Sequence, residues 1–417
     1  MEKYMSPLNE GKSVLLINIG WEQQDYIEKL HNLGCNIFAV HHEECTFDSR
    51  LKDLLICDYF CVDEIIQFAL QKEITAVLTD QCDYALYAAA AVNDALNLTG
   101  VSMREAISTT DKGIQRNLVS SSNDTLLQPR WFLCKDIQSA HDNIETIGFP
   151  AIVKPVDARG SFGVTKIEML AELKSAFFSA IAQSSSRQVI IEQFILGEQY
   201  TIDGYVDLKQ GAQVLNIAKK KMLSESVQVA VEISYNQSIP AHLYSRLREY
   251  NLAVVNGLGL KFGMTHGEYM VTPSGDIYLI EIANRGGGCF TSTLILHSST
   301  GFDFSSKLIA DSLGIESQVC NYNLLSKNSI SLIFFSIPKS GKVKSIIGVD
   351  NLLSNPKILY YRCNIAVGED VVVTSNDADR HGFIIVKDAQ AVNINYELQV
   401  VGINFYNGEV INPICYR

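Results

Sequence analysis

Short apolar runs alternate with segments of helical periodicity over the first hundred residues. Ser13–Ile19, Asn36–Val40 and Thr75–Thr79 are apolar runs of strand length, and they predict buried parallel strands. Glu22–Leu33 and Tyr84–Leu96 lie between or after them and carry apolar residues at helical spacing. Such alternation is typical of a doubly wound parallel sheet and therefore predicts an N-terminal α/β domain.

The hydrophobic pattern changes twice along the rest of the chain. After about Gly100, single helical segments alternate with groups of apolar strands, and from about Ser329 short strands and turns dominate. The fold class expected is therefore α/β and α+β, with a β-rich end. The predicted domains are an α/β domain over 1–105, a two-part α+β domain over 106–315 with its small subdomain at about 130–195, and a C-terminal β-rich domain over 316–417.

Composition narrows the class of function. The 417 residues carry a net charge of −12, which disfavours general binding of nucleic acid. No apolar run approaches the ~18 residues needed to cross a membrane, and the first residues lack a secretory pattern. The ten cysteines form no C-x-x-C pair, so reduced thiols and a cytoplasmic location are expected.

The first segment that carries chemistry is a strand followed by a glycine-bearing loop. The strand of residues 151–155 delivers Lys154, and the loop can expose backbone N–H groups to phosphate oxygens. The loop residues concerned are Arg159, Gly160, Ser161, Phe162 and Gly163. The alternative is a plain hairpin with an unpaired lysine, but an unpartnered ammonium in this apolar strand would be costly. Phosphate binding is therefore favoured.

The second segment is a strand end followed by a short apolar linker. Glu192, Gln193 and Phe194 end a predicted strand, Gly197 turns the chain, and Glu198 opens the next strand. Backbone groups of such a linker can pair with an adenine edge, and the carboxylate that follows can accept from ribose hydroxyls. A solvated glutamate beside a turn is an equal alternative for Glu198.

The third segment is a predicted hairpin with one carboxylate on each strand. Glu268 and Glu281 are placed to face each other, and two carboxylates of this kind suit Mg²⁺. Arg285 follows Glu281 by four residues, and three glycines come directly after it. The alternative is a structural, buried ion pair between Glu281 and Arg285. His266 lies beside the site, and adjacency is its only link to a role.

In this order and spacing, the three segments resemble the ATP-grasp superfamily, in particular its carboxylate–amine ligases of the carbamoyl-phosphate-synthetase-like and L-amino-acid-ligase-like branches. An Asp111-Lys112 pair before a predicted helix adds to the likeness, which covers roughly residues 13–310. Each motif alone is modest, but together they are specific. The resemblance implies an ATP-grasp fold of two α+β subdomains behind an N-terminal α/β domain.

The resemblance also implies roles at the matching positions. Lys112 and Lys154 would contact the ATP phosphates, and the loop from Arg159 would close over them. Glu192, Gln193 and Phe194 would border adenine, and Glu198 would bind the ribose. Glu268 and Glu281 would hold Mg²⁺, usually two ions, with Mn²⁺ as an alternative. Lys154 and Arg285 would be catalytic, since Arg285 would stabilise the transferred phosphoryl group.

One position departs from the pattern of metal ligands in the family. Many relatives carry a further asparagine ligand two residues after the second glutamate, where this chain has Ala283 and then Asn284. The period of two along a strand would turn Asn284 to the opposite face.

Asp80 and Asp83, at the end of a predicted strand, are interpreted as caps of the following helix rather than as a site for an ammonium group.

The function expected is ATP- and Mg²⁺-dependent ligation of a small carboxylate to an amine, such as an amino acid, through an acyl phosphate. A kinase on the same fold and a non-catalytic nucleotide-binding regulatory protein are the alternatives. The expected partners are small molecules, without nucleic acid or membrane, and a homodimer is compatible with the resemblance.

Overall fold

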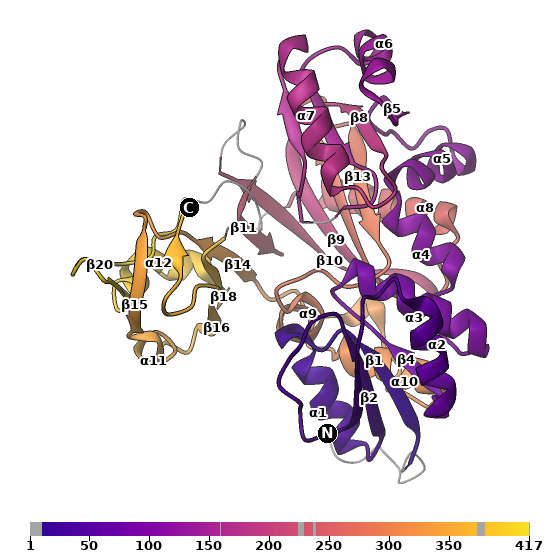
Figure 1. Ribbon diagram of the computed structural model, residues 1–417, viewed down its shortest axis with the longest axis vertical. Coiled ribbons are helices and arrows are strands. Elements are labelled where there is room, and N and C mark those ends of the chain that lie inside the picture. The colour runs from indigo at the N-terminus through magenta and orange to yellow at the C-terminus, as the bar shows by residue number, and fades with distance from the viewer. Residues whose placement is uncertain (1–10, 159, 224–228, 237–238, 373–379, 417) are drawn as a thin grey trace.

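The computed structural model describes residues 11–158, 160–223, 229–236, 239–372 and 380–416, which form four sheets (Figure 1). The first sheet contains β1 (Ser13–Ile17), β2 (Asn36–His41), β3 (Leu51–Ile56) and β4 (Ala76–Leu78). Its order is β3-β2-β1-β4 and every pairing is parallel, which confirms the predicted doubly wound sheet. Sequence analysis missed β3, because Lys52 and Asp53 interrupt its apolar run.

Helices cover both faces of this first sheet. The helices are α1 (Gln24–Asn32), α2 (Val62–Gln71), α3 (Asp83–Leu96) and α4 (Met103–Thr110). Helix α5 (Lys112–Ser122) follows α4 and contributes Val119 to a different core, that of the largest sheet. One core joins Leu15, Ile17 and Val77 to residues of α2 and α3, and a second joins Val14, Leu16 and Leu78 to α1. Alternate residues of β1 therefore enter different cores, as the period of two along a strand requires.

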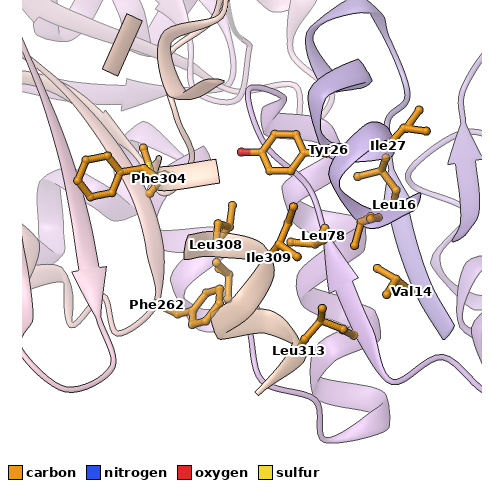
Figure 2. Packing of buried hydrophobic residues seen from close by; sticks show 14 of the residues in the cluster. Val14, Leu16, Tyr26, Ile27, Leu78, Phe262, Phe304, Leu308, Ile309 and Leu313 are labelled. Atoms are coloured by element: carbon orange, nitrogen blue, oxygen red, sulfur yellow. The ribbon is translucent and has the colours of Figure 1, made fainter. Parts of the chain in front are cut away.

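The second of these cores is closed by a helix from far along the chain. Helix α10 (Phe304–Leu313) places Leu308, Ile309 and Leu313 against Leu16, Leu78 and Ile27 (Figure 2). In Figure 1, α10 accordingly lies beside β4 of the N-terminal sheet. The first domain thus contains a covering helix from a distant segment, whereas the predicted boundaries at 105 and 315 stay predictions.

Ion pairs reinforce the attachment of α10. Asp303 caps the helix by accepting from the Ser306 N–H, and it accepts from Lys29 Nζ of α1 at 2.9 Å. Burial alone would raise the pKa of the Asp303 carboxyl, but Lys29 and the N–H of Ser306 lower it from 3.8 to about 2. The charged form of Asp303 therefore stabilises the fold at neutral pH.

Replacement of Asp303 by Asn tests this charge. Asparagine is as good an N-cap as aspartate, so the substitution removes the charge and retains the cap. A depressed folded-state pKa contributes stability that is present above the unfolded pKa and lost as the pH falls. We expect D303N to lower the free energy of unfolding by about 1–2 kcal/mol at pH 7 and the difference to vanish between about pH 4 and pH 2.

Urea denaturation across this pH range measures the effect. Asp136, which caps α6 (Ile137–Ile147) by accepting from the Ser139 N–H, provides the matched control D136N. Among the described residues, Asp136 has no ion-pair partner within 4 Å. A pH-independent difference for D303N would contradict the role given to the charge.

The small subdomain is an antiparallel sheet with two helices on one face. It contains β5 (Trp131–Cys134), β6 (Ala151–Pro155), β7 (Thr165–Ile167), β8 (Val189–Gln193), α6 and α7 (Leu170–Gln183), in strand order β5-β8-β6-β7. Ala151 and Val153 pack against the helices. Lys154 lies next to Val153 and therefore points to the opposite face, which borders the site described below.

The largest sheet has eight strands and continues from the middle of the chain into its C-terminal part. It contains β9 (Glu198–Asp207), β10 (Gly211–Met222), β11 (Ala230–Tyr235), β12 (Gly263–Val271), β13 (Ile277–Ala283), β14 (Ile330–Phe335), β16 (Ile358–Cys363) and β18 (Gly382–Lys387). The order is β13-β12-β9-β10-β11-β14-β18-β16. Helix α8 (Ala241–Leu258) packs against the β9–β13 part through one core.

The C-terminal region is β-rich, as predicted, and has its own core behind the large sheet. A four-stranded sheet in the order β17-β15-β19-β20 contains β15 (Gly341–Ile347), β17 (Asp370–Val371), β19 (Gly402–Phe405) and β20 (Val410–Ile411). The remaining short elements are α9 (Leu296–Thr300), α11 (Val349–Leu352), α12 (Ile394–Leu398), a π-helix at Thr291–Ile295, and 3-10 helices at Trp21–Gln23, Tyr322–Leu324 and Ala389–Ala391.

Candidate active site

Two adjoining cavities lie between the small subdomain, the large sheet and the N-terminal domain. The larger has a volume of about 420 Å³ and the smaller of about 140 Å³. Both are lined by Lys112, Ala158, Gly160, Ser161, Lys220, Glu268 and Glu281. The shared wall therefore holds two carboxylates and two lysines at the junction of the cavities.

The two carboxylates at the junction stand opposite each other. Glu268 of β12 and Glu281 of β13 are register partners across the hairpin, as predicted. Lys220 Nζ lies 3.0 Å from Glu268 Oε1, and Lys112 Nζ lies 3.4 Å from Glu281 Oε2. Burial alone would raise the pKa of Glu281, but Lys112, Lys154 and Arg285 lower it to about 2. Glu281 is therefore placed as a charged oxygen donor at neutral pH, and the Glu268 carboxylate faces it across the hairpin.

These donors fit Mg²⁺, which is commonly held by one or two carboxylates together with substrate phosphates and water. The side chain of Glu281 is 44% exposed to the cavity, so it can accept a ligand without displacing the sheet. Asn284 does not join them, because β13 ends at Ala283 and the Asn284 amide donates to the carbonyls of Phe262 and Met264. Among the described residues, no group of three or more acidic, histidine or cysteine side chains is placed to hold a metal.

Lys154 belongs to a buried ion cluster beneath the smaller cavity. Its Nζ lies 2.7 Å from Glu192 Oε2, and Arg116 Nε donates to Glu192 Oε1 at 3.0 Å. Burial lowers the pKa of Lys154, whereas Arg116 and Lys154 lower that of Glu192 against the effect of burial. The alternative of a plain hairpin with an unpaired lysine is therefore wrong. The ammonium is fixed at the cavity wall by a carboxylate.

The part of the loop after β6 that starts at Gly160 has backbone geometry suited to an anion-binding turn. Gly160, Ser161 and Gly163 all have positive φ, at +62°, +62° and +69°. Gly160 and Ser161 line both cavities, and the side chain of Phe162 is 46% exposed. Arg159, which was predicted to act with this loop, lies outside the described residues.

The linker between β8 and β9 borders the smaller cavity. Glu192, Gln193, Phe194 and Ile195 line that cavity, and the Phe194 N–H donates to the Pro150 carbonyl at 3.2 Å. This bond fixes the linker to the residue that precedes β6. The Phe194 ring lies under Lys166 Nζ at 4.3 Å.

Glu198 and Gln199 occupy opposite faces of β9. Glu198 is 57% exposed, pairs with Lys219 at 2.5 Å, and lines neither cavity. Gln199 lines the smaller cavity and donates to Glu268 Oε2 at 2.7 Å. The geometry therefore does not support the prediction for Glu198, because strand alternation turns that carboxylate away. Gln199 was not predicted, and the only sign of it in the sequence is that it directly follows Glu198.

Arg285 enters the larger cavity and is held by the N-terminal domain. Its Nε and terminal nitrogen donate to the two oxygens of Asp83 at 2.9 and 2.7 Å. Burial alone would lower the pKa of Arg285, but Asp83 and Glu281 raise it, so the guanidinium stays charged. The alternative of a structural ion pair between Glu281 and Arg285 is wrong, because the hydrogen-bonded carboxylate is Asp83.

The acidic residues at the end of β4 do not cap α3, which corrects that interpretation. The N-cap position is Cys82, and no side chain caps the helix. Asp80 instead accepts from the Tyr26 hydroxyl at 2.8 Å and from the Gly286 N–H at 2.7 Å. Together with Asp83 it connects the N-terminal domain to the glycine-rich segment that follows Arg285.

The sequence linked His266 to the site by adjacency alone and did not predict its partner, Asp203. His266 lines the larger cavity, and its Nδ1 lies 2.7 Å from Oδ1 of the fully buried Asp203 on the neighbouring strand. Asp203 and His266 are register partners of β9 and β12. A lone aspartate in an apolar strand was the available signal, but its partner could be identified only from the pairing of the strands.

Comparison with known families gives two matches within the chain. Residues 147–293 match the ATP-grasp domain, and residues 333–395 match the L-amino acid ligase C-terminal domain 2. The first region contains the loop after β6, the linker and the carboxylate hairpin. The second lies in the C-terminal part, including β18 and the second half of β14.

Individual proteins agree with these matches. The chain is 24% identical over 262 residues to the arginine-specific large chain of carbamoyl phosphate synthase from Arabidopsis thaliana, which covers 60% of this chain and 22% of that protein. It is 28% identical over 183 residues to D-alanine–D-alanine ligase from Azobacteroides pseudotrichonymphae, which covers 42% of this chain and 53% of that protein. The chain thus spans between about a fifth and a half of these curated relatives.

Solved structures extend the likeness to the whole fold. L-amino acid ligase from Bacillus licheniformis superposes with a TM-score of 0.82 at 18% identity, over 96% of this chain and 100% of that structure. Phosphoribosylglycinamide synthetase from Anaerococcus prevotii has a TM-score of 0.72 at 16% identity, over 95% of this chain and 100% of that structure.

Proposed function

Because the chain carries an ATP-grasp domain followed by an L-amino acid ligase C-terminal domain, we propose that it is an ATP- and Mg²⁺-dependent carboxylate–amine ligase. One observation carries the proposal. Two opposed carboxylates, two lysines and the glycine-bearing loop stand at the junction of a smaller and a larger cavity. A nucleotide in the smaller cavity would present its terminal phosphate to a substrate in the larger one.

The nucleotide would lie along the smaller cavity. Its adenine would contact the linker from Glu192 to Ile195, and Gln199 rather than Glu198 would reach the ribose. Lys112, Lys154 and the Gly160–Gly163 loop would contact the phosphates. Glu268 and Glu281 would hold Mg²⁺, which when bound neutralises phosphate charge and polarises the phosphoryl oxygens.

The larger cavity would hold the carboxylate and the amine. An oxygen of the substrate carboxylate attacks the γ-phosphorus, the bond to the β-phosphate oxygen breaks, and ADP leaves. The amine nitrogen then attacks the acyl carbon, phosphate departs, and the nitrogen loses a proton. The chain's part is electrostatic, because Lys154 and Arg285 offset the repulsion between two anions and stabilise charge that develops on the phosphoryl and acyl oxygens.

The test is a matrix of small carboxylates against amines, read as ADP and phosphate release and confirmed by product mass. A ligase forms an amide with both products released in equal amounts. A stable phosphorylated product would indicate a kinase, and ATP binding without turnover over a broad panel would indicate a regulatory protein. Either outcome would overturn the proposal.

Asp83 is expected to position Arg285 for this reaction. D83N keeps the shape of the side chain but removes the charge that fixes the guanidinium by two hydrogen bonds. Because small displacements of a catalytic group are costly, we expect kcat to fall about 100-fold with little change in KM for ATP. Steady-state kinetics measures the split between kcat and KM.

Asp94 provides the control for this substitution. It lies near the other end of α3, is exposed, and accepts from the Met103 N–H at 3.0 Å. D94N should therefore retain kcat. Equal kcat values for D83N and the unaltered protein would exclude the positioning role.

We further propose that the protein acts in the cytoplasm on small molecules alone. No disulfide joins any of the ten cysteines, which fits a reducing environment. Within the described ranges, none of the helices has the length and apolar character required to cross a membrane. The net charge of −12 continues to disfavour nucleic acid.

A further inference from the structure

Three aromatic rings line the larger cavity on the side of the N-terminal domain. Phe60 precedes α2, and Tyr84 and Tyr87 lie in the first turns of α3. The Phe60 ring lies 5.9 Å from each tyrosine ring, and Phe60 itself is 52% exposed. We call these three residues the aromatic wall. Binding of an apolar ligand over the exposed phenylalanine at the centre of this group removes apolar surface from water, which stabilises the complex.

The aromatic wall is placed at a defined separation from the charged end of the cavity. Asp83, which holds Arg285, immediately precedes Tyr84 and lies four residues before Tyr87 on α3. Side chains four residues apart on a helix are neighbours, with about 5–6 Å between their Cβ atoms. A substrate whose carboxylate faces Arg285 therefore has its substituent within reach of the rings.

The large sheet adds apolar side chains to the cavity, and three of the cavity's five carboxylates are paired with a cation of the protein. Ile233, Leu332 and Phe334 line the same cavity from the large sheet. The five carboxylates of the cavity are each engaged within the protein, by an ion pair or by a hydrogen bond from a backbone N–H. They are Asp83 with Arg285, Asp111 with the Ile114 N–H, Asp157 with the Ser186 N–H, Glu268 with Lys220, and Glu281 with Lys112.

We propose that the carboxylate substrate carries an aromatic or large apolar group that packs against Phe60, Tyr84 and Tyr87. This inference rests on the proposed function, since it names the substrate class of the same site. Specificity would then reside largely in the N-terminal domain, outside the segment that matches the ATP-grasp domain. Burial of a ring against such a wall supports discrimination of about 10- to 100-fold against a small side chain.

The experiment compares L-phenylalanine, L-alanine, L-lysine and L-glutamate as the carboxylate component with one common amine. ADP release gives kcat and KM, and calorimetry with MgADP present gives binding without turnover. We expect kcat/KM to favour phenylalanine over alanine by at least about tenfold. F60A and Y87A should each lower this ratio about tenfold through KM.

Phe178 provides a matched control, since it is 51% exposed on α7 and lines neither cavity. F178A should leave the ratio unchanged. A preference for alanine, lysine or glutamate, no binding of phenylalanine, or an unchanged ratio in F60A and Y87A would overturn the inference and leave ligation standing. Binding of phenylalanine that weakens in Y87A, without ADP release from any pair, would support the aromatic wall and overturn ligation.

Discussion

Replacement of Glu281 by Gln is expected to reduce Mg²⁺-dependent ADP formation about 100- to 1,000-fold. The substitution keeps the size of the side chain but removes the charge that faces Glu268 across the hairpin. Lys112, Lys154 and Arg285 hold the pKa of Glu281 at about 2, so the carboxylate is charged over the whole useful pH range. Without this carboxylate, the positive charges of the three side chains are less compensated. The site should therefore bind a divalent cation weakly.

The measurement is ADP release as a function of Mg²⁺ concentration with the best substrate pair. Loss of a metal ligand predicts that the Mg²⁺ requirement of E281Q rises steeply, in addition to the fall in kcat. E198Q is the matched control, since Glu198 is also a paired glutamate at a strand end but lines neither cavity. Full activity in E281Q at the ordinary Mg²⁺ concentration would refute the metal assignment, and loss of activity in E198Q would restore the ribose role predicted for Glu198.

Replacement of Glu192 by Ala is expected to cause a large loss in the free energy of unfolding. E192A leaves the ammonium of Lys154 and the guanidinium of Arg116 in the interior without their shared carboxylate. Arg116 is fully buried and Lys154 is 5% exposed, so both cations would lose their shared partner at places with little access to solvent. Removing one member of a buried ion cluster typically costs about 3–5 kcal/mol, and we expect a loss of that size in the free energy of unfolding.

Urea unfolding at pH 7 measures this loss, and E198A provides the control. The exposed pair of Glu198 with Lys219 is of a kind that contributes about 0–1 kcal/mol. A difference below about 1 kcal/mol between E192A and E198A would show that the cluster is not a stabilising unit. A variant E192A that binds ATP as tightly as the unaltered protein would show that Lys154 does not depend on Glu192 for its position.

The carboxylate hairpin could be predicted from sequence because its two strands are close along the chain. Once the turn at residues 273–275 is placed, the register pairs Tyr269 with Leu279 and brings the two carboxylates within one residue of each other. An irregularity of one residue between Glu268 and Tyr269 then sets Glu268 opposite Glu281. The loop after β6 and Lys154 are local in the same way. For these residues, spacing and apolar context contain most of the information.

Other parts of the site depend on contacts between distant segments. Asp83 meets Arg285, and Asp203 meets His266, through the arrangement of the domains and the order of strands in the large sheet. Neighbouring residues of a strand face opposite sides, so Gln199 lines the smaller cavity and Glu198, one residue earlier, does not. The attachment of α10 to the first sheet has no local signal.

That attachment bears on how the protein is made. During synthesis, residues of the first sheet emerge early, but their core stays open until Leu308, Ile309 and Leu313 have left the ribosome. Apolar side chains such as Leu16 and Leu78 are therefore exposed while the whole ATP-grasp region is being translated. A fragment that stops before α10 should be prone to aggregation, whereas a fusion that carries α10 on a linker should fold more readily.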